Sequence, residues 1–300
     1  MDSLTIHAMA KINLGLDVLR RRENGYHDVK MVMQTVDLYD SLTFKKSKVP
    51  GIFIQTDHEN IPCDESNLIY KAASIMREKY GIEEGVEITL KKQIPIAAGM
   101  AGGSTDAAAT FVGINSLFDL QIQIEELKKI AVTVGADVPY CIEGGTALSE
   151  GIGEILSPLP EAPECYLVIA KPAISVSTAY VYGNLHVEKL EHHPDIDGLV
   201  EAIKNQNIGK MCALMENVLE TVTKAKHPVI GELEDILDQQ GALKSMMSGS
   251  GPTVFGIFTD KEKALKALEA IEQKGSCEKC VLTTFAPKAQ VVIEEEARKE

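Results

Sequence analysis

Residues 95–106 read PIAAGMAGGSTD, a run of small residues between an alternating stretch and a helical pattern. The preceding residues 86–90 (VEITL) alternate apolar and polar side chains, which predicts a strand. The small-residue segment that follows, 106–118, predicts a helix. Gly and Ala allow successive backbone N–H groups to point at an anion, and the amino end of a helix adds its dipole. The stretch therefore predicts a strand–loop–helix unit that cradles a phosphate group.

The same stretch also fits a tight strand-to-helix turn that needs small residues only for packing. It has neither the lysine of G-x-x-x-x-G-K-[ST] nor the spacing of G-x-G-x-x-G, so it belongs to neither of the two commonest phosphate-binding motifs. Residues elsewhere in the chain must decide between the two interpretations.

Lys11 and Asn13 stand two residues apart in the apolar strand pattern of residues 4–19, so their side chains share one face. A lysine among apolar neighbours is costly without a partner, although a lone strand lysine is most often exposed at an edge. Asp137 lies in a short turn before Pro139, where an aspartate usually closes or caps the turn. Each signal is weak alone and gains meaning only if the fold brings these residues together.

Aromatic side chains are scarce, since the chain has no Trp and 5% aromatic residues. Tyr26 and His27 lie on the tip of the first expected hairpin, and Thr178 and Tyr182 follow a strand in the second half. Rings at such places can stack on a base, and they can equally pack on their neighbours. Residues 249–252 (GSGP) join two expected strands and either form a plain hairpin turn or close over a ligand.

The pattern of elements predicts an α+β chain of two domains. The first half reads as a hairpin of strands 4–19 and 29–36, a helix capped by Ser66, the strand–loop–helix unit and a helix at 125–134. The second half reads as a strand, three helices, two strands, a helix and a strand, at residues 166–170, 196–206, 210–222, 228–240, 243–247, 253–258, 261–274 and 280–285. A Pro-bounded break near residue 160 divides the chain into domains 1–160 and 161–300.

Three blocks resemble, in order, the three motifs of the GHMP small-molecule kinases: residues 10–14 (AKINL), 95–109 and 248–254. Residues 25–27 (GYH) and 135–139 (GADVP) are more specific, and they are similar to members that act on a cytidine-diphosphate-linked methylerythritol. The resemblance covers residues from about 8 to 258. It implies an N-terminal S5-like α/β domain, a C-terminal ferredoxin-like α+β domain and a site in the cleft between them.

The resemblance also implies a role for each matching residue. Lys11 and Asp137 are expected to be catalytic, with Asp137 accepting the proton of the substrate hydroxyl and Lys11 orienting that carboxylate. The expected substrate-binding residues, with the two tyrosines enclosing the cytosine, are Asn13, Tyr26, His27, Thr178 and Tyr182. ATP is expected to bind Pro95, Ala97, Ala98, Gly99, Met100, Ala101, Gly102, Gly103, Ser104 and Thr105, with Asn67 and Lys92 seating the adenosine. ATP implies Mg²⁺, for which Ser104 is a candidate ligand and no acidic ligand stands out.

The activity implied is ATP-dependent phosphorylation of the 2-hydroxyl of that cytidyl alcohol, in the non-mevalonate pathway to isoprenoid precursors. Another small alcohol, such as homoserine or mevalonate, is the alternative, although a base-stacking clamp has no use for it. A nucleotide-binding regulator without turnover would need neither Lys11 nor Asp137. A serine hydrolase centred on Ser104 or Ser250 lacks the G-x-S-x-G motif.

Charge excludes some partners. The 30 Lys and Arg against 44 Asp and Glu give a net charge of −14, which argues against binding to nucleic acid or an anionic membrane. The first basic cluster follows the first apolar stretch, the reverse of a secretory signal, and no apolar run approaches the ~18 residues of a membrane span. We therefore expect a cytoplasmic enzyme that acts on small molecules and is a monomer or a weak homodimer.

Overall fold

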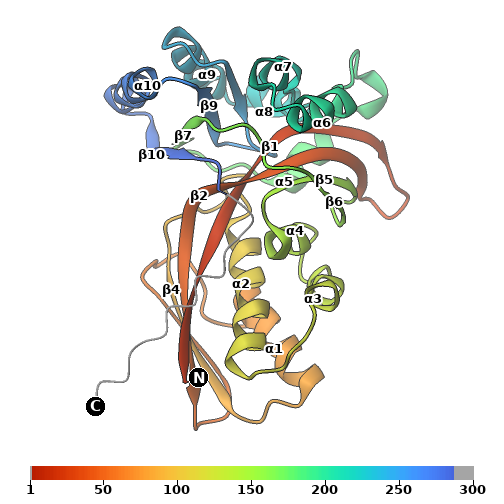
Figure 1. The fold of residues 1–300 in the computed structure, drawn as a ribbon, viewed down its shortest axis with the longest axis vertical. Coiled ribbons are helices and arrows are strands. Elements are labelled where there is room, and N and C mark those ends of the chain that lie inside the picture. Colours follow the sequence, from red (N-terminus) through yellow and green to blue (C-terminus); the bar gives the residue numbers. More distant parts are fainter. Residues whose placement is uncertain (1, 287–300) are drawn as a thin grey trace.

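The computed structural model describes residues 2–286, which contain two separate β-sheets. The first has the strand order β3-β4-β2-β5-β6, with β1 paired to β2 off this path. Its strands are β1 (Ser3–Arg21), β2 (His27–Ser47), β3 (Ile52–Thr56), β4 (Gly85–Lys91), β5 (Thr146–Gly151) and β6 (Ile155–Pro158). The long β1–β2 pair runs through the height of the molecule (Figure 1) and is antiparallel throughout.

Helices cover one face of the lower half of this sheet (Figure 1). They are α1 (Leu68–Tyr80), α2 (Gly102–Leu117), α3 (Ile124–Ala131) and α4 (Val138–Glu143). The small residues of α2 let it lie close to the sheet: a Cβ on Gly113 would stand 2.6 Å from the Phe44 ring. Leu42, Phe44 and Phe111 belong to the apolar core that this packing creates.

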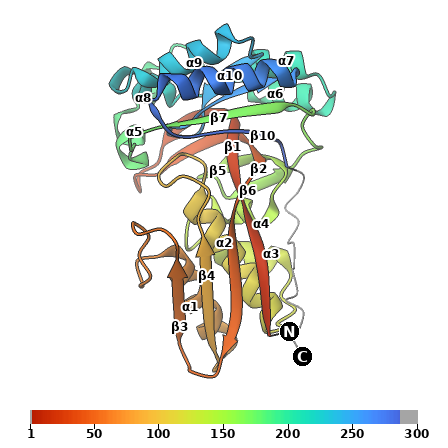
Figure 2. The same cartoon turned by 90° about the vertical axis from the view of Figure 1, so that its left-hand side faces the viewer.

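The second sheet has the order β10-β7-β9-β8, with every pair antiparallel. Its strands are β7 (Tyr166–Pro172), β8 (Lys244–Met247), β9 (Val254–Phe258) and β10 (Cys277–Thr284). The other elements of this half are α5 (Thr178–Asn184), η1 (Val187–Lys189), α6 (Ile196–Lys204), α7 (Ile208–Leu214), α8 (Glu220–Lys226), α9 (Val229–Gln239) and α10 (Lys261–Lys274). Figure 2 shows α9 and α10 lying over β7 and β10 on the side away from the first sheet. The α+β class is confirmed, and the order of the second sheet is that of a ferredoxin-like domain.

The upper halves of β1 and β2 join the two parts of the molecule. Ile12, Leu14 and Val32 pack in one core with Ile169 and Phe255 of the second sheet. The last strand of the first sheet ends at Pro158, and the first strand of the second sheet begins at Tyr166. This crossing is consistent with the domain boundary that we propose near residue 160. Residues 287–300, the end of the expected second domain, lie outside the described residues.

The structure corrects two predicted elements of the first half. β2 extends to Ser47 instead of ending at residue 36, because β1 shifts its register against β2 between Met9 and Ala10 and both strands then continue. The helix α2 begins at Gly102, four residues before the expected start, so the end of the phosphate-loop motif is helical.

Two further corrections concern helix ends. Residues 210–222 form α7 and the start of α8 and not one helix, because residues between them pair with β1. The cap of α1 is Asn67 and not Ser66, since the Asn67 side chain accepts the hydrogen bond from the Ile69 amide. In the described part of the chain, none of the helices has the length and apolar character that crossing a membrane requires.

Candidate functional site

Side chains of the loop between β4 and α2 point alternately into the core and away from it. Ala98 and Met100 are buried in the core shared with the second sheet, whereas Ala97 is exposed. The Met100 carbonyl accepts a hydrogen bond from the Lys11 amide at 3.2 Å, which fastens the loop to β1. The first turn of α2, from Gly102, presents backbone amides that have no acceptor within the helix. These amides and the helix dipole favour an anion at this point.

Three loop residues adopt the left-handed conformation: Ala97 (φ 50°), Gly99 (φ 72°) and Ala101 (φ 59°). This conformation costs an alanine roughly 1–2 kcal/mol, and such strain concentrates at functional sites. At Gly99 the space is also restricted, since a Cβ would stand 2.2 Å from the Ser248 carbonyl oxygen. Gly99 therefore has to be glycine, because the loop there meets a turn of the second sheet.

Lys11, Asn13 and Asp137 meet beside this loop. Lys11 Nζ donates to Asn13 Oδ1 at 2.8 Å and lies 3.8 Å from Asp137 Oδ2. The Lys11 side chain is 6% exposed and that of Asp137 33% exposed, so the carboxylate faces open space. Although Asp137 holds the N-cap position of α4, its side chain makes no capping hydrogen bond. The lysine is therefore not an exposed edge residue, and the aspartate is not a helix cap.

Aromatic residues also line the same space. His27 is 9% exposed, and its ring centroid lies 5.2 Å from that of Tyr182. Burial, followed by the charge of Arg21, lowers the pKa of His27, so the ring is neutral at pH 7. Tyr26 is 58% exposed at the hairpin tip. Thr178, the first residue of α5, lies with its Oγ1 2.9 Å from Ser250 Oγ.

One cavity of ≈ 800 Å³ joins these groups. Most of the predicted site residues line it: Lys11, Asn13, Tyr26, His27, Ala97, Ala98, Gly99, Ala101, Gly102, Gly103, Ser104, Asp137, Thr178 and Tyr182. Among the described residues that line it, Asp137 is the one carboxylate. The volume, and the presence of both charged and aromatic side chains in the walls, suit a ligand of nucleotide size.

Five of the predicted ATP-binding residues do not line this cavity: Asn67, Lys92, Pro95, Met100 and Thr105. The Asn67 side chain caps α1, and its Nδ2 donates to the Pro62 carbonyl at 2.6 Å. Thr105 Oγ1 donates to the Met9 carbonyl at 2.8 Å. These side chains hold the surroundings of the loop together.

The contacts of Lys92 explain most clearly why its side chain does not line the cavity. Its Nζ lies 2.5 Å from Asp40 Oδ2 and 2.7 Å from Asp106 Oδ2, and all three side chains are 5% exposed or less. Asp40 Oδ1 also accepts hydrogen bonds from the Gln93 and Ile94 amides. Burial by itself would lower the pKa of Lys92, but the two carboxylates raise it. The ammonium group therefore fixes both ends of the loop instead of reaching into the cavity.

Gly249 and Ser250 were not among the predicted site residues, yet both line the cavity. Residues 249–252 do form the hairpin turn between β8 and β9, as the glycines indicated. The turn is also a wall of the site, since Ser248 Oγ donates to the Gly99 carbonyl at 3.0 Å. The sequence signal was a glycine-rich turn with two possible uses; the hairpin turn is confirmed, and closure over a ligand stays a prediction.

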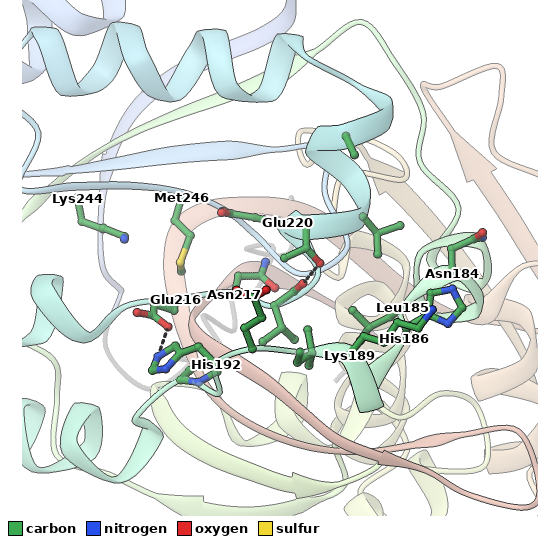
Figure 3. Close-up of a pocket in the computed structure, with 17 residues that line it drawn as sticks. Asn184, Leu185, His186, Lys189, His192, Glu216, Asn217, Glu220, Lys244 and Met246 are labelled. Atoms are coloured by element: carbon green, nitrogen blue, oxygen red, sulfur yellow. Dashed lines mark hydrogen bonds and ion pairs between the residues drawn. The ribbon is translucent and has the colours of Figure 1, made fainter.

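A second cavity, of ≈ 740 Å³, lies in the second half of the molecule (Figure 3). Its walls include His186, His192, Glu216, Asn217 and Lys244, with none of the predicted site residues. The first cavity is thus the candidate active site, because the groups able to act on a phosphate or a hydroxyl line it.

Comparison with known families and proteins agrees with this assignment. The model of the GHMP kinases N terminal domain matches residues 67–145, and that of the GHMP kinases C terminal domain matches residues 199–277. The chain is 50% identical to the 4-diphosphocytidyl-2-C-methyl-D-erythritol kinase of Lachnospira eligens, over 96% of this chain and 100% of that protein. It is 51% identical to the protein of the same name from Lachnoclostridium phytofermentans, over 89% and 92%.

Solved structures show the same fold. A crystal structure of 4-(cytidine 5'-diphospho)-2C-methyl-D-erythritol kinase matches with a TM-score of 0.80 and 31% identity, covering 94% of this chain and 99% of that one. A homoserine kinase from Cytophaga hutchinsonii matches with a TM-score of 0.78 and 22% identity, covering 97% and 96%. The second likeness is one of fold alone.

Proposed function

The chain belongs to the 4-diphosphocytidyl-2-C-methyl-D-erythritol kinases of the GHMP family, and we propose from this premise how its cavity phosphorylates the 2-hydroxyl of 4-diphosphocytidyl-2-C-methyl-D-erythritol with ATP. The protein is a small-molecule kinase of isoprenoid biosynthesis. The observation that carries the mechanism is the placement of Lys11 and Asp137 beside the amide-rich loop, with His27 and Tyr182 lining the same cavity.

Asp137 is the proposed general base. The acceptor hydroxyl attacks the γ-phosphorus of ATP, the bond from that phosphorus to the β,γ-bridging oxygen breaks, and the hydroxyl proton passes to the carboxylate as ADP leaves. Support comes from the exposure of Asp137 to the cavity and from its being the one carboxylate among the described lining residues. Lys11 has proton donors left beyond its hydrogen bond to Asn13, so it can hold the carboxylate and offset charge on the transferred group.

The amides at the start of α2 are proposed to hold the ATP phosphates. Within residues 2–286 no three His, Cys, Asp or Glu side chains are close enough to hold a metal ion. The chain therefore fits Mg²⁺ held mainly by phosphate oxygens, with the Ser104 hydroxyl as a protein ligand, which is the usual manner of binding for this ion. When bound, it would neutralise phosphate charge.

The aromatic wall is proposed to bind cytosine. A neutral His27 can donate one hydrogen bond and accept another, which a pyrimidine edge requires. Tyr26 is exposed enough to close over the base, and Tyr182 already lies against His27. Homoserine and mevalonate would leave these groups unused, and the names of the 50% and 51% identical relatives favour the cytidyl alcohol.

The test is ADP release from ATP and Mg²⁺ with 4-diphosphocytidyl-2-C-methyl-D-erythritol, beside mevalonate, homoserine and galactose. Turnover with the cytidyl alcohol alone is expected. Turnover with another alcohol instead would contradict the assignment of Tyr26, His27 and Tyr182. Absence of turnover with every alcohol, while ATP still binds, would support a regulator.

A further inference from the structure

The turn at residues 248–251 contacts both walls of the active-site cavity. Ser248 Oγ donates to the carbonyl of Gly99 in the phosphate loop. Gly249 lies next to both walls, since a Cβ there would stand 3.2 Å from the Gly99 carbonyl oxygen and 3.4 Å from Asn13 Oδ1. Ser250 Oγ lies 2.9 Å from Thr178 Oγ1. A shift of this turn would therefore move the ATP side and the acceptor side relative to each other.

The turn is held from behind by Asn217. Its Nδ2 donates to the Met247 carbonyl at 2.9 Å and to the Gly249 carbonyl at 2.8 Å. Its Oδ1 accepts from the Leu219 amide at 3.0 Å, and the residue is 5% exposed. Both donors and the acceptor of this side chain are thus used in a buried position, where losing a partner is costly.

Asn217 is itself fixed to the strand that carries Lys11 and Asn13. The Leu16 amide donates to the Glu216 carbonyl at 2.9 Å, and the Val218 amide donates to the Leu16 carbonyl at 3.1 Å. This pairing with β1 is what interrupts the helix expected at 210–222. Departures from local sequence preference are expected at functional positions.

Two neighbours complete the support of the turn. Glu220 Oε1 accepts from the Met247 amide at 2.6 Å, and Thr223 Oγ1 donates to the Ser250 carbonyl at 3.2 Å. In Figure 3 Asn217 and Glu220 lie side by side at the second cavity, which Glu216 also lines. Asn217 thus lies between that cavity and the turn.

We propose that Asn217 is a positioning residue for phosphoryl transfer: through the carbonyls of Met247 and Gly249 it sets the turn that aligns the phosphate loop with Asn13 and Thr178. The proposal rests on the proposed function and adds a residue outside the lining of the active-site cavity. A displacement of about 1 Å at an aligned site can lower the rate about 10²-fold.

The test variant is Asn217→Asp, which keeps the acceptor for the Leu219 amide and replaces the donor to both carbonyls. We expect kcat to fall about 10²-fold and by a larger factor than either KM rises. Asn115→Asp is the matched control. Asn115 makes the same kind of contact with another loop, donating to the Ile122 carbonyl and accepting from the Ile122 amide, both at 3.0 Å. This control should lose thermal stability while its kcat stays within about twofold of the unmodified enzyme.

Turnover of the unmodified enzyme is measured first, so that its absence contradicts the proposed function and not the role of Asn217. A folded Asn217→Asp enzyme with unchanged kcat, or a kcat loss matched by Asn115→Asp, would overturn the positioning role. If Asn217→Asp does not fold, Thr223→Val decides, because it removes the hydroxyl that donates to the Ser250 carbonyl of the turn at 3.2 Å and to the Leu219 carbonyl beside it at 3.3 Å. A kcat loss of about threefold or more supports the proposal, and an unchanged kcat overturns it.

Discussion

Two lysine–aspartate clusters lie beside the loop between β4 and α2, and they differ in how many carboxylates contact the lysine. Lys92 lies within 2.7 Å of two carboxylates, with all three side chains 5% exposed or less. Lys11 lies 3.8 Å from Asp137, whose side chain is 33% exposed. Identical residue types thus make a closed cluster in one place and an open pair in the other.

The difference teaches which cluster can take part in chemistry. A lysine whose donors are taken by two buried carboxylates can offer little to a ligand, but it fixes the elements that carry those carboxylates. A looser pair at a cavity keeps hydrogen-bonding capacity for substrate. Proximity to the phosphate loop is shared by both clusters, so it does not distinguish a catalytic residue from a structural one.

The open pair is tested by Asp137→Ala. Loss of a general base lowers kcat by about 10²–10⁴-fold, and we expect this fall without loss of ATP binding. Steady-state kinetics and calorimetric titration with ATP measure the two effects. Asp197→Ala, which removes a carboxylate paired with Lys30 at the surface, should leave both unchanged. Near-normal turnover of Asp137→Ala would show that the open pair is not catalytic.

The closed cluster is tested by Lys92→Met. This change leaves the buried Asp40 carboxylate without its counterion and Asp106 without its hydrogen-bond donor, so the free energy of unfolding should fall by about 3–5 kcal/mol. Lys11→Met serves as the reciprocal control, with a large loss of kcat and a smaller loss of stability, about 1–3 kcal/mol, because it leaves the buried Asn13 Oδ1 without its donor. Urea unfolding and ADP release on both variants measure the contrast. Equal stability losses would erase the distinction between the clusters.

The acceptor side of the open cavity is tested by Tyr26→Ala. Stacking on a base contributes about 1–3 kcal/mol, so KM for the cytidyl substrate should rise about tenfold while KM for ATP changes little. Tyr180→Ala is the matched control. Tyr180 is 39% exposed on α5, and Lys226 Nζ lies 3.6 Å from the centroid of its ring. Equal rises in both KM values would remove Tyr26 from the base-binding wall.

The smallest effect is a pH dependence of the closed cluster. Burial, reinforced by the charge of Asp40 and opposed by Lys92, raises the pKa of Asp106 to about 8. The folded protein therefore keeps a proton that the unfolded chain releases above its ordinary pKa, and this contribution to stability is lost as pH rises from about 4 to 8. Compared with Asp106→Asn, the unmodified protein should lose stability across this range.

Urea unfolding between pH 5 and 9 measures this difference. Asp28→Asn is the control, because Arg20 and Arg22 lower the pKa of Asp28 and keep it ionised throughout that range. The same pH dependence in the unmodified protein and in Asp106→Asn would show that the Asp106 carboxyl titrates like an ordinary acid.

Elements with a local signal could be predicted well. The predicted helix at 261–274 and the observed α10 have the same bounds. The reason is local: the Asp260 side chain caps the first amides, and Gly275 ends the helix in the left-handed conformation. β2 was predicted too short, because residues 37–41 (DLYDS) interrupt the apolar pattern where one of the aspartates, Asp40, is buried by partners from distant parts of the chain. The break before Asn217 had no local signal, since β1 imposes it.

For the site too, features with a local sequence signal could be predicted, and those set by distant contacts could not. Lys11 and Asn13 share a face because strand side chains alternate, and the small residues of the loop allow its turn, so both features were legible in the sequence. Lys92 and Asn67 match the family's motifs by position, but their side chains are occupied by contacts within the protein. Their predicted contact with adenosine stays a prediction.

The sequence by itself determined the α+β class, the small-residue loop before α2 with its turned backbone, and the shared strand face of Lys11 and Asn13. These depend on backbone freedom, side-chain alternation and helix ends, which act over a few residues. Only the tertiary structure decided that Asp137 faces the cavity, that Asp40 and Asp106 occupy Lys92, and that Asn217 supports the turn at Gly249. Burial and partner geometry across the fold set these roles, and a linear pattern does not contain them.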